Sequence, residues 1–108
     1  MQNSVLTKIH WLPPEEGGRN SLPAAKRYST VSRFTEDADS WLSDAWSIVL
    51  EFDKPPSEQG NPSIGRASFL AEEAPVGRLQ PGREFGLYEG RKKVAIAKVL
   101  EEQFGDSE

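Results

Sequence analysis

Residues 81–100 read PGREFGLYEGRKKVAIAKVL, and this stretch decides the predicted fold. Two runs that alternate between apolar and polar side chains, 84–88 and 93–100, lie on either side of Glu89-Gly90-Arg91-Lys92. Glycine adopts a positive φ without steric cost, so Gly90 can close a tight turn between the two runs. The stretch therefore predicts a hairpin of two antiparallel strands, and Pro81-Gly82 predicts a further turn before it.

The same alternation predicts four more strands upstream of the hairpin. Residues 45–52 show the pattern most clearly, and Pro13-Pro14 ends the first strand because proline cannot donate a ladder hydrogen bond. The predicted strands are 4–12, 26–34, 45–52, 65–71, 83–88 and 93–100. The side chains expected in the core are Ile9 or the residues on its face of the first strand, with Trp46, Ile48, Leu50, Phe69, Phe85, Leu87, Val94 and Ile96.

The segments between the predicted strands have the composition of loops. Three prolines and a glycine within 53–64 predict a long exposed loop, and Val76 and Leu79 are expected to anchor the loop 72–80 to the core. The acidic segment 35–44 is also expected to be a loop, and the acidic tail 101–108 to fray. Six short strands without a long helix predict an all-β fold, a six-stranded antiparallel closed barrel.

Length and composition limit the class of protein. A chain of 108 residues fits one domain over 1–108. The net charge of -4 disfavours non-specific nucleic-acid binding, which depends on neutralising phosphates. The absence of cysteine fits a reducing cytoplasm, no apolar run approaches the roughly 20 residues that span a bilayer, and no signal peptide is visible. We therefore expect a cytoplasmic protein without membrane contact.

No arrangement of residues predicts catalysis. The sequence holds neither a Gly-x-Ser-x-Gly elbow nor a phosphate-binding loop, and its single histidine, His10, excludes a multi-histidine metal site within one copy. The adjacent glutamates Glu15-Glu16 and Glu72-Glu73 fall in predicted loops, where such pairs are normally solvated. We expect no enzymatic activity, no cofactor and no bound metal.

Basic residues supply the candidate binding surface. They could form a patch for phosphate or for an acidic partner. Alternatively, lysine and arginine near the hairpin turn could serve only to blunt strand edges. The candidate partner-binding residues are Arg19, Arg66, Arg83, Arg91, Lys92 and Lys93.

Two consecutive glycines, Gly17-Gly18, precede Arg19. Glycine pairs carry an entropic cost, so their presence predicts a turn that side chains would obstruct, with a positive φ. A guanidinium held by such a turn can bind a carboxylate with two parallel hydrogen bonds. We expect the carboxylate to belong to this chain, as Glu84 or Glu89, with a partner protein as the alternative.

Residues 8–12 read Lys-Ile-His-Trp-Leu, followed by Glu15-Glu16-Gly17-Gly18-Arg19 and Pro23. This order resembles the opening of the carboxy-terminal barrel domain of bacterial elongation factor Tu, with its Glu-Glu-Gly-Gly-Arg loop and His-Thr-Pro step. Residues 82–94 are similar to that family's last strands, which follow the pattern Arg-Phe-Ala-Ile-Arg-Glu-Gly-Gly-Arg-Thr-Val. The resemblance runs from about residue 7 to residue 100 and implies a six-stranded antiparallel barrel.

The resemblance does not include the factor's GTPase domain or its middle barrel, so it implies no nucleotide site. In the factor, the third domain helps to hold the T arm of aminoacyl-tRNA, partly through a glycine-rich last hairpin. Here Arg91 replaces the second glycine of that hairpin, Lys92 replaces its arginine, and Ala95 and Ala97 replace two glycines. The predicted second strand also lacks the family's proline. Each added Cβ argues against a close backbone approach to tRNA.

These considerations favour a small non-enzymatic protein-interaction module built on an elongation-factor-Tu-like barrel. The alternative is an RNA- or ribosome-associated binding protein linked to translation. An RNA-binding protein would gather its basic residues on one face beside an exposed aromatic ring. The identity of the partner and the oligomeric state stay open.

Overall fold

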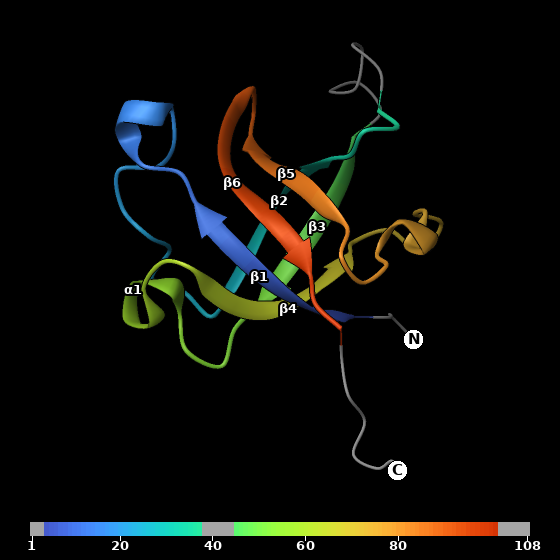
Figure 1. The fold of residues 1–108 in the computed structure, drawn as a ribbon, viewed down its shortest axis with the longest axis horizontal. Helices are drawn as coiled ribbons and strands as arrows, with labels where there is room; N and C mark the ends of the chain where they lie inside the picture. Colours follow the sequence, from blue (N-terminus) through green and yellow to red (C-terminus); the bar gives the residue numbers. More distant parts are fainter. Residues whose placement is uncertain (1–3, 38–44, 102–108) are drawn as a thin grey trace.

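The computed structural model describes residues 4–37 and 45–101, which form a closed barrel of six antiparallel strands (Figure 1). The order around the barrel is β1-β4-β3-β2-β5-β6, and β6 pairs back onto β1. This confirms the predicted fold class, and every strand lies within two residues of its predicted limits. The strands are β1 (Val5–Trp11), β2 (Arg27–Arg33), β3 (Trp46–Glu51), β4 (Ser63–Phe69), β5 (Glu84–Glu89) and β6 (Lys92–Val99).

The first strand closes the barrel because it pairs on both sides. Ile9 lies opposite Ser63 of β4 on one side and opposite Ala97 of β6 on the other. A closed sheet has no free outer strand, and its interior is filled by the inward side chains of every strand. β1 begins and β6 ends at the same end of the barrel, and the β5–β6 turn lies at the other end (Figure 1).

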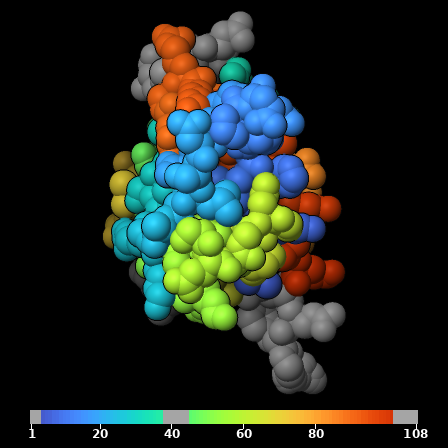
Figure 2. Space-filling model, turned by 90° about the vertical axis from the view of Figure 1, so that its left-hand side faces the viewer, coloured from blue at the N-terminus to red at the C-terminus, as the bar shows by residue number. Residues whose placement is uncertain are grey.

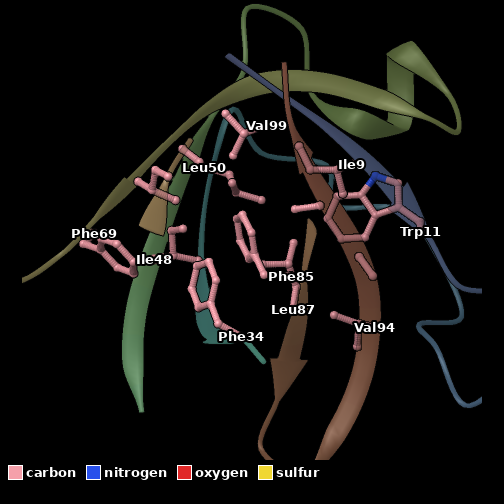
Figure 3. Close-up of a cluster of buried hydrophobic side chains, with 14 of the residues drawn as sticks. Ile9, Trp11, Phe34, Ile48, Leu50, Phe69, Phe85, Leu87, Val94 and Val99 are labelled. Carbon is pink, nitrogen blue, oxygen red and sulfur yellow. The ribbon is translucent and has the colours of Figure 1, made fainter. Parts of the chain in front are cut away.

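The core occupies the barrel interior, where side chains from all six strands meet (Figure 3). Ile9, Ile48 and Leu87 are fully buried there, as the alternation predicted. Small side chains alternate with these large ones, because Ala67, Ala95 and Ala97 are also fully buried. Narrow barrels combine large and small interior residues in this way to fill a limited volume.

A β-bulge in β6 overturns one predicted core position. Leu87 lies opposite Ala95, whereas Tyr88 lies opposite Lys93, so Val94 is an extra residue in β6. Val94 and Ala95 are both buried as a result, and the alternation reverses beyond them. Ile96 is therefore half-buried on the outer face of the barrel, and its predicted place in the core was wrong.

Trp46, another predicted core residue, is only partly buried and packs against the core cluster.

The loops also differ from expectation in two places. The segment 53–64 contains a short helix, α1 (Pro56–Gln59), whose Pro56 is fully buried, and β4 begins within that segment at Ser63. In the loop 72–80, Leu79 is buried as predicted, but Val76 is 44% exposed.

Two single-turn 3-10 helices, η1 (Pro14–Glu16) and η3 (Val76–Arg78), lie in the loops that follow β1 and β4. The part of the acidic loop at 38–44 and the tail beyond residue 101 lie outside the described residues.

Leu50→Ala is expected to cost about 2–5 kcal/mol of unfolding free energy, because it removes a fully buried side chain and leaves a cavity. The matched control is Ile64→Ala on β4, where the side chain is 40% exposed, and its expected cost is below about 1 kcal/mol. Urea denaturation of both variants measures the difference. Equal costs would contradict the assignment of Leu50 to the barrel interior.

Candidate binding surface at the β5–β6 hairpin

The end of the β5–β6 hairpin extends past the strands beside it. The β2–β5 pairing ends at Val31 opposite Tyr88, and the β1–β6 pairing ends at Trp11 opposite Ala95. One further backbone bond joins Leu12 N–H to the Val94 carbonyl at 2.9 Å. Residues 89–93, called the hairpin tip below, therefore project from the barrel (Figure 2).

The tip carries three exposed cations in succession: Arg91, Lys92 and Lys93, called the tip cations below. Gly90, with φ 63°, forms the turn between the strands, which the sequence predicted. Three adjacent positive charges make the tip itself basic on a chain of net charge -4.

The loop between β1 and β2 packs beside the tip, and its two glycines shape it. Gly17 has φ 88°, a left-handed conformation, and caps η1. Gly18 lies against the end of β1, where an added Cβ would come within 1.9 Å of the Leu12 carbonyl oxygen. Both glycines are therefore required for different reasons: the first by its dihedral angle and the second by close backbone contact.

This loop brings Arg19 to the base of the hairpin tip, where it pairs with Glu89. Arg19 Nη1 lies 2.5 Å from Glu89 Oε2, and Arg19 Nε donates a hydrogen bond to the Ser21 carbonyl at 2.9 Å. The Tyr28 hydroxyl donates a second hydrogen bond to the same Glu89 oxygen. The internal carboxylate predicted for Arg19 is thus confirmed, with Glu89 rather than Glu84 as the partner.

Contacts between aromatic rings connect the cluster of Arg19, Tyr28 and Glu89 to the core. The Arg19 guanidinium lies 5.6 Å from the centroid of the Tyr28 ring, and that ring meets Trp11 edge-on at 5.5 Å. Trp11 is buried, and its Nε1 donates to Ser63 Oγ at 3.0 Å. The base of the hairpin tip is therefore connected through a continuous set of contacts to the end of β1 and the start of β4.

The cluster shifts the protonation equilibria of its members. Burial raises the pKa of Tyr28, and the hydrogen bond to Glu89 raises it further, to about 12. Burial also raises the pKa of Glu89, but the hydrogen bonds from Tyr28 and Arg19 outweigh that effect and leave it below its usual value. At neutral pH the cluster holds an ionised Glu89 between a neutral phenol and a guanidinium.

Two other predicted binding residues lie far from the tip and have partners within the chain. Arg83 precedes β5, forms an ion pair with Glu36, and lies over the Phe34 ring at 4.9 Å. Arg66, on β4, donates to Ser4 Oγ at 3.0 Å. The six predicted residues therefore do not form one surface. The structure brings together Arg91, Lys92 and Lys93, with Arg19 at their base.

A groove lies on the outer face of β2, β5 and β6, next to the tip, with a volume of about 450 Å³. Arg33, Gly86 and Ile96 form a row across the three strands, and Gly86 in the middle of that row has no side chain of its own. The Tyr88 ring and the Lys93 side chain cover Gly86, because a Cβ added there would lie 2.8 Å from Tyr88 Cε1 and 3.4 Å from Lys93 Cε. We call this feature the outer groove.

The sequence analysis did not assign a role to Gly86, Tyr88 or Ile96. A signal for Gly86 was present, since a glycine inside a strand often marks a bulge or a close approach of another group. The position of Ile96 on the outer face depends on the bulge at Val94, and no residue type in the sequence predicts that bulge. The hydrogen bond from the Tyr28 hydroxyl to Glu89 depends on the pairing of β2 with β5, which the alternation pattern does not predict.

Comparison with models of known protein families and with curated proteins finds no match to this chain. In the two described ranges, no helix is long and apolar enough to span a membrane. Nor do the side chains in those ranges gather three histidine, aspartate or glutamate residues that could hold a metal ion.

Gly17→Ala and Gly18→Ala are expected to differ in stability. Gly17→Ala places an alanine at φ 88° in open space, so its cost is about 1–2 kcal/mol. Gly18→Ala is expected to cost more than Gly17→Ala, because its Cβ would overlap the Leu12 carbonyl and the backbone must move. Denaturation midpoints of the two variants measure this. A milder effect for Gly18→Ala would contradict the close contact with β1.

An alkaline titration tests the tyrosine cluster. The Tyr28 hydroxyl is expected to ionise at about pH 12, whereas an ordinary tyrosine ionises at about pH 10. The variant Tyr28→Phe is expected to remove the transition at high pH. Because the folded-state pKa is raised, the stability that Tyr28 contributes is present below about pH 10 and is lost as the pH rises towards 12. Absorbance near 295 nm follows the phenolate. Loss of the high transition in Tyr88→Phe instead would contradict the assignment.

Proposed function

We propose that this chain is a non-enzymatic protein-interaction module on an elongation-factor-Tu-like barrel, and that its hairpin tip binds an acidic surface of a partner protein. The observation that carries the proposal is the set of three exposed tip cations on an otherwise acidic chain. Complementary charge at an exposed site accelerates encounter with an oppositely charged partner and disfavours partners of like charge.

The base of the tip supports a role in recognition. The pair formed by Arg19 and Glu89 compensates the one carboxylate within 89–93. Lys92 lies directly opposite Glu89 and also attracts that carboxylate, while the other two tip cations, Arg91 and Lys93, are exposed. The bond from Arg19 holds the base of the tip against the loop that follows β1, and the bond from Tyr28 holds it against β2, which limits the loss of conformational entropy on binding.

A protein partner is favoured over RNA by the small area of the basic surface. Binding to a nucleic-acid backbone scales with the number of phosphates neutralised, and a stripe of cations along one face serves it best. Arg66 and Arg83 lie away from the tip and bond to Ser4 and Glu36. RNA binding remains the second candidate because Tyr88 stands next to Lys93 on the outer face, where a base could stack.

The test is affinity capture from the source cells with all three tip cations reversed to glutamate. We expect the captured partner to decrease at least about tenfold relative to the unchanged chain, because charge complementarity becomes repulsion. The matched control reverses three exposed lysines elsewhere on the barrel, Lys8, Lys26 and Lys54, which changes the net charge by the same amount.

An equal loss of capture in both triple variants would show an effect of net charge alone and would overturn the role of the tip. Parallel samples treated with nuclease separate the two candidates. Capture that persists after nuclease supports a protein partner, whereas capture that nuclease abolishes supports RNA.

A further inference from the structure

A small pocket lies at the base of the hairpin tip, between the end of β1 and the loop that follows it, and Arg19 forms part of its wall. We call it the Arg19 pocket. Its volume is about 170 Å³, whereas pockets for drug-sized ligands have roughly 300–1,000 Å³. One water molecule occupies about 30 Å³ in the liquid, so the pocket has room for one side chain of a binding partner rather than for a whole small-molecule ligand.

Arg19 keeps hydrogen-bond donors after its internal contacts are made. A guanidinium carries five N–H groups. Arg19 Nε donates to the Ser21 carbonyl and Nη1 donates to Glu89, while Nη2 donates to no group in the described part of the chain. The side chain is only 28% exposed, so water reaches this group from few directions. The guanidinium can therefore bind a second carboxylate without releasing Glu89.

The loop adds backbone donors to the same wall. Residues 20–22 all line the pocket, and none of their backbone N–H groups donates a hydrogen bond within the described ranges. Two acceptors in the lining are already used: the Pro13 carbonyl accepts two backbone hydrogen bonds, and the Asn61 side-chain oxygen accepts one from Trp11 N–H. Successive backbone N–H groups next to a guanidinium are a combination that binds anions.

The charge around the pocket agrees with an anionic occupant. None of the described residues that line it is acidic. Glu89 compensates Arg19, but Lys92 lies directly opposite Glu89 and attracts the same carboxylate, so these three side chains carry one net positive charge. Glu15 and Glu16, in the same loop, are exposed and do not line the pocket. The excess charge is small, so the hydrogen-bond donors determine which group is bound.

We infer that the Arg19 pocket binds one carboxylate of the partner protein. Arg19 Nη2 and the backbone N–H groups of residues 20–22 are its donors, and Leu12, Pro13 and Leu22 pack against the methylene groups that carry it. This inference rests on the proposed function and adds to it the chemical group that is recognised. The tip cations then accelerate encounter, and the pocket fixes how the partner is oriented on the hairpin.

The experiment uses the isotope-labelled chain and three peptides of five residues. The first has blocked ends and one central glutamate, the second has glutamine in its place, and the third is the glutamine peptide with a free carboxyl terminus. Shifts of the backbone amides and of the Arg19 Nε–H signal locate binding even when it is weak.

We expect the glutamate peptide to shift Arg19 and residues 20–22, and to bind at least about tenfold more tightly than the glutamine peptide. The reason is that hydrogen bonds to a charged acceptor are roughly twice as strong as those to a neutral one. Binding of the third peptide at the same residues would identify a chain terminus as a further source of the carboxylate.

One variant and a matched control test the guanidinium. Arg19→Lys keeps the charge but replaces the forked donors by one ammonium, so the preference for glutamate over glutamine is expected to fall below about threefold. Arg27→Lys makes the same change in another arginine that pairs with a glutamate, Glu51 at 3.5 Å, but that does not line the pocket. It is expected to leave the preference unchanged. The dispersion of the amide spectrum shows whether each variant is folded, and the peptide comparison on the unchanged chain does not depend on either.

Several outcomes would overturn the inference. Equal binding of the glutamate and glutamine peptides, shifts confined to residues 90–93, or no shift with any peptide would remove the pocket as a carboxylate site, and the proposed function would still stand on the tip cations. An unchanged preference in Arg19→Lys would also overturn it. Conversely, glutamate-dependent shifts in the pocket, together with partner capture that survives reversal of the tip cations, would reject the role of the tip and retain the pocket.

Discussion

The pairing of β1 with β6 is the constraint on which the other features depend. It joins the two strands that would otherwise form the edges of the sheet and so closes the barrel. The closed barrel has a narrow interior, which fully buried alanines on β4 and β6 help to fill. It also fixes where support for the hairpin ends, because β1 stops at Trp11 while β6 continues towards its turn. The projection of the tip is thus a consequence of unequal strand lengths within a closed sheet.

The bulge at Val94 determines which side chains of β6 reach the outer face. In a regular strand, the inward positions of Ala95 and Ala97 would place residue 93 inside the barrel as well. The extra residue places Val94 in the core and leaves Lys93 outside, while Ile96 also faces outward. The inserted residue therefore lets Lys93 face outward on the same side of β6 as Ile96.

The sequence predicted the strands well because a barrel wall with one buried face imposes a strict period of two, which residues such as Ile48 and Leu50 report directly. It also predicted the Arg19 ion pair, because a glycine pair has few uses other than a constrained turn. It failed for Ile96, since a bulge changes the phase of the pattern without changing composition. The outer groove was missed for another reason: the neighbours of Gly86 come from three strands, and only the register reveals them.

The projection of the hairpin tip also separates the residues that hold the fold from those exposed for recognition. Residues 90–93 pair with no strand outside their own hairpin in the described structure, so substitutions among them change few contacts of the barrel. Solvent-exposed turns of this kind tolerate replacement and insertion more readily than strands do. Variation at the tip can accordingly change the preferred partner while the chain stays folded throughout, and binding preference and stability can evolve along separate routes.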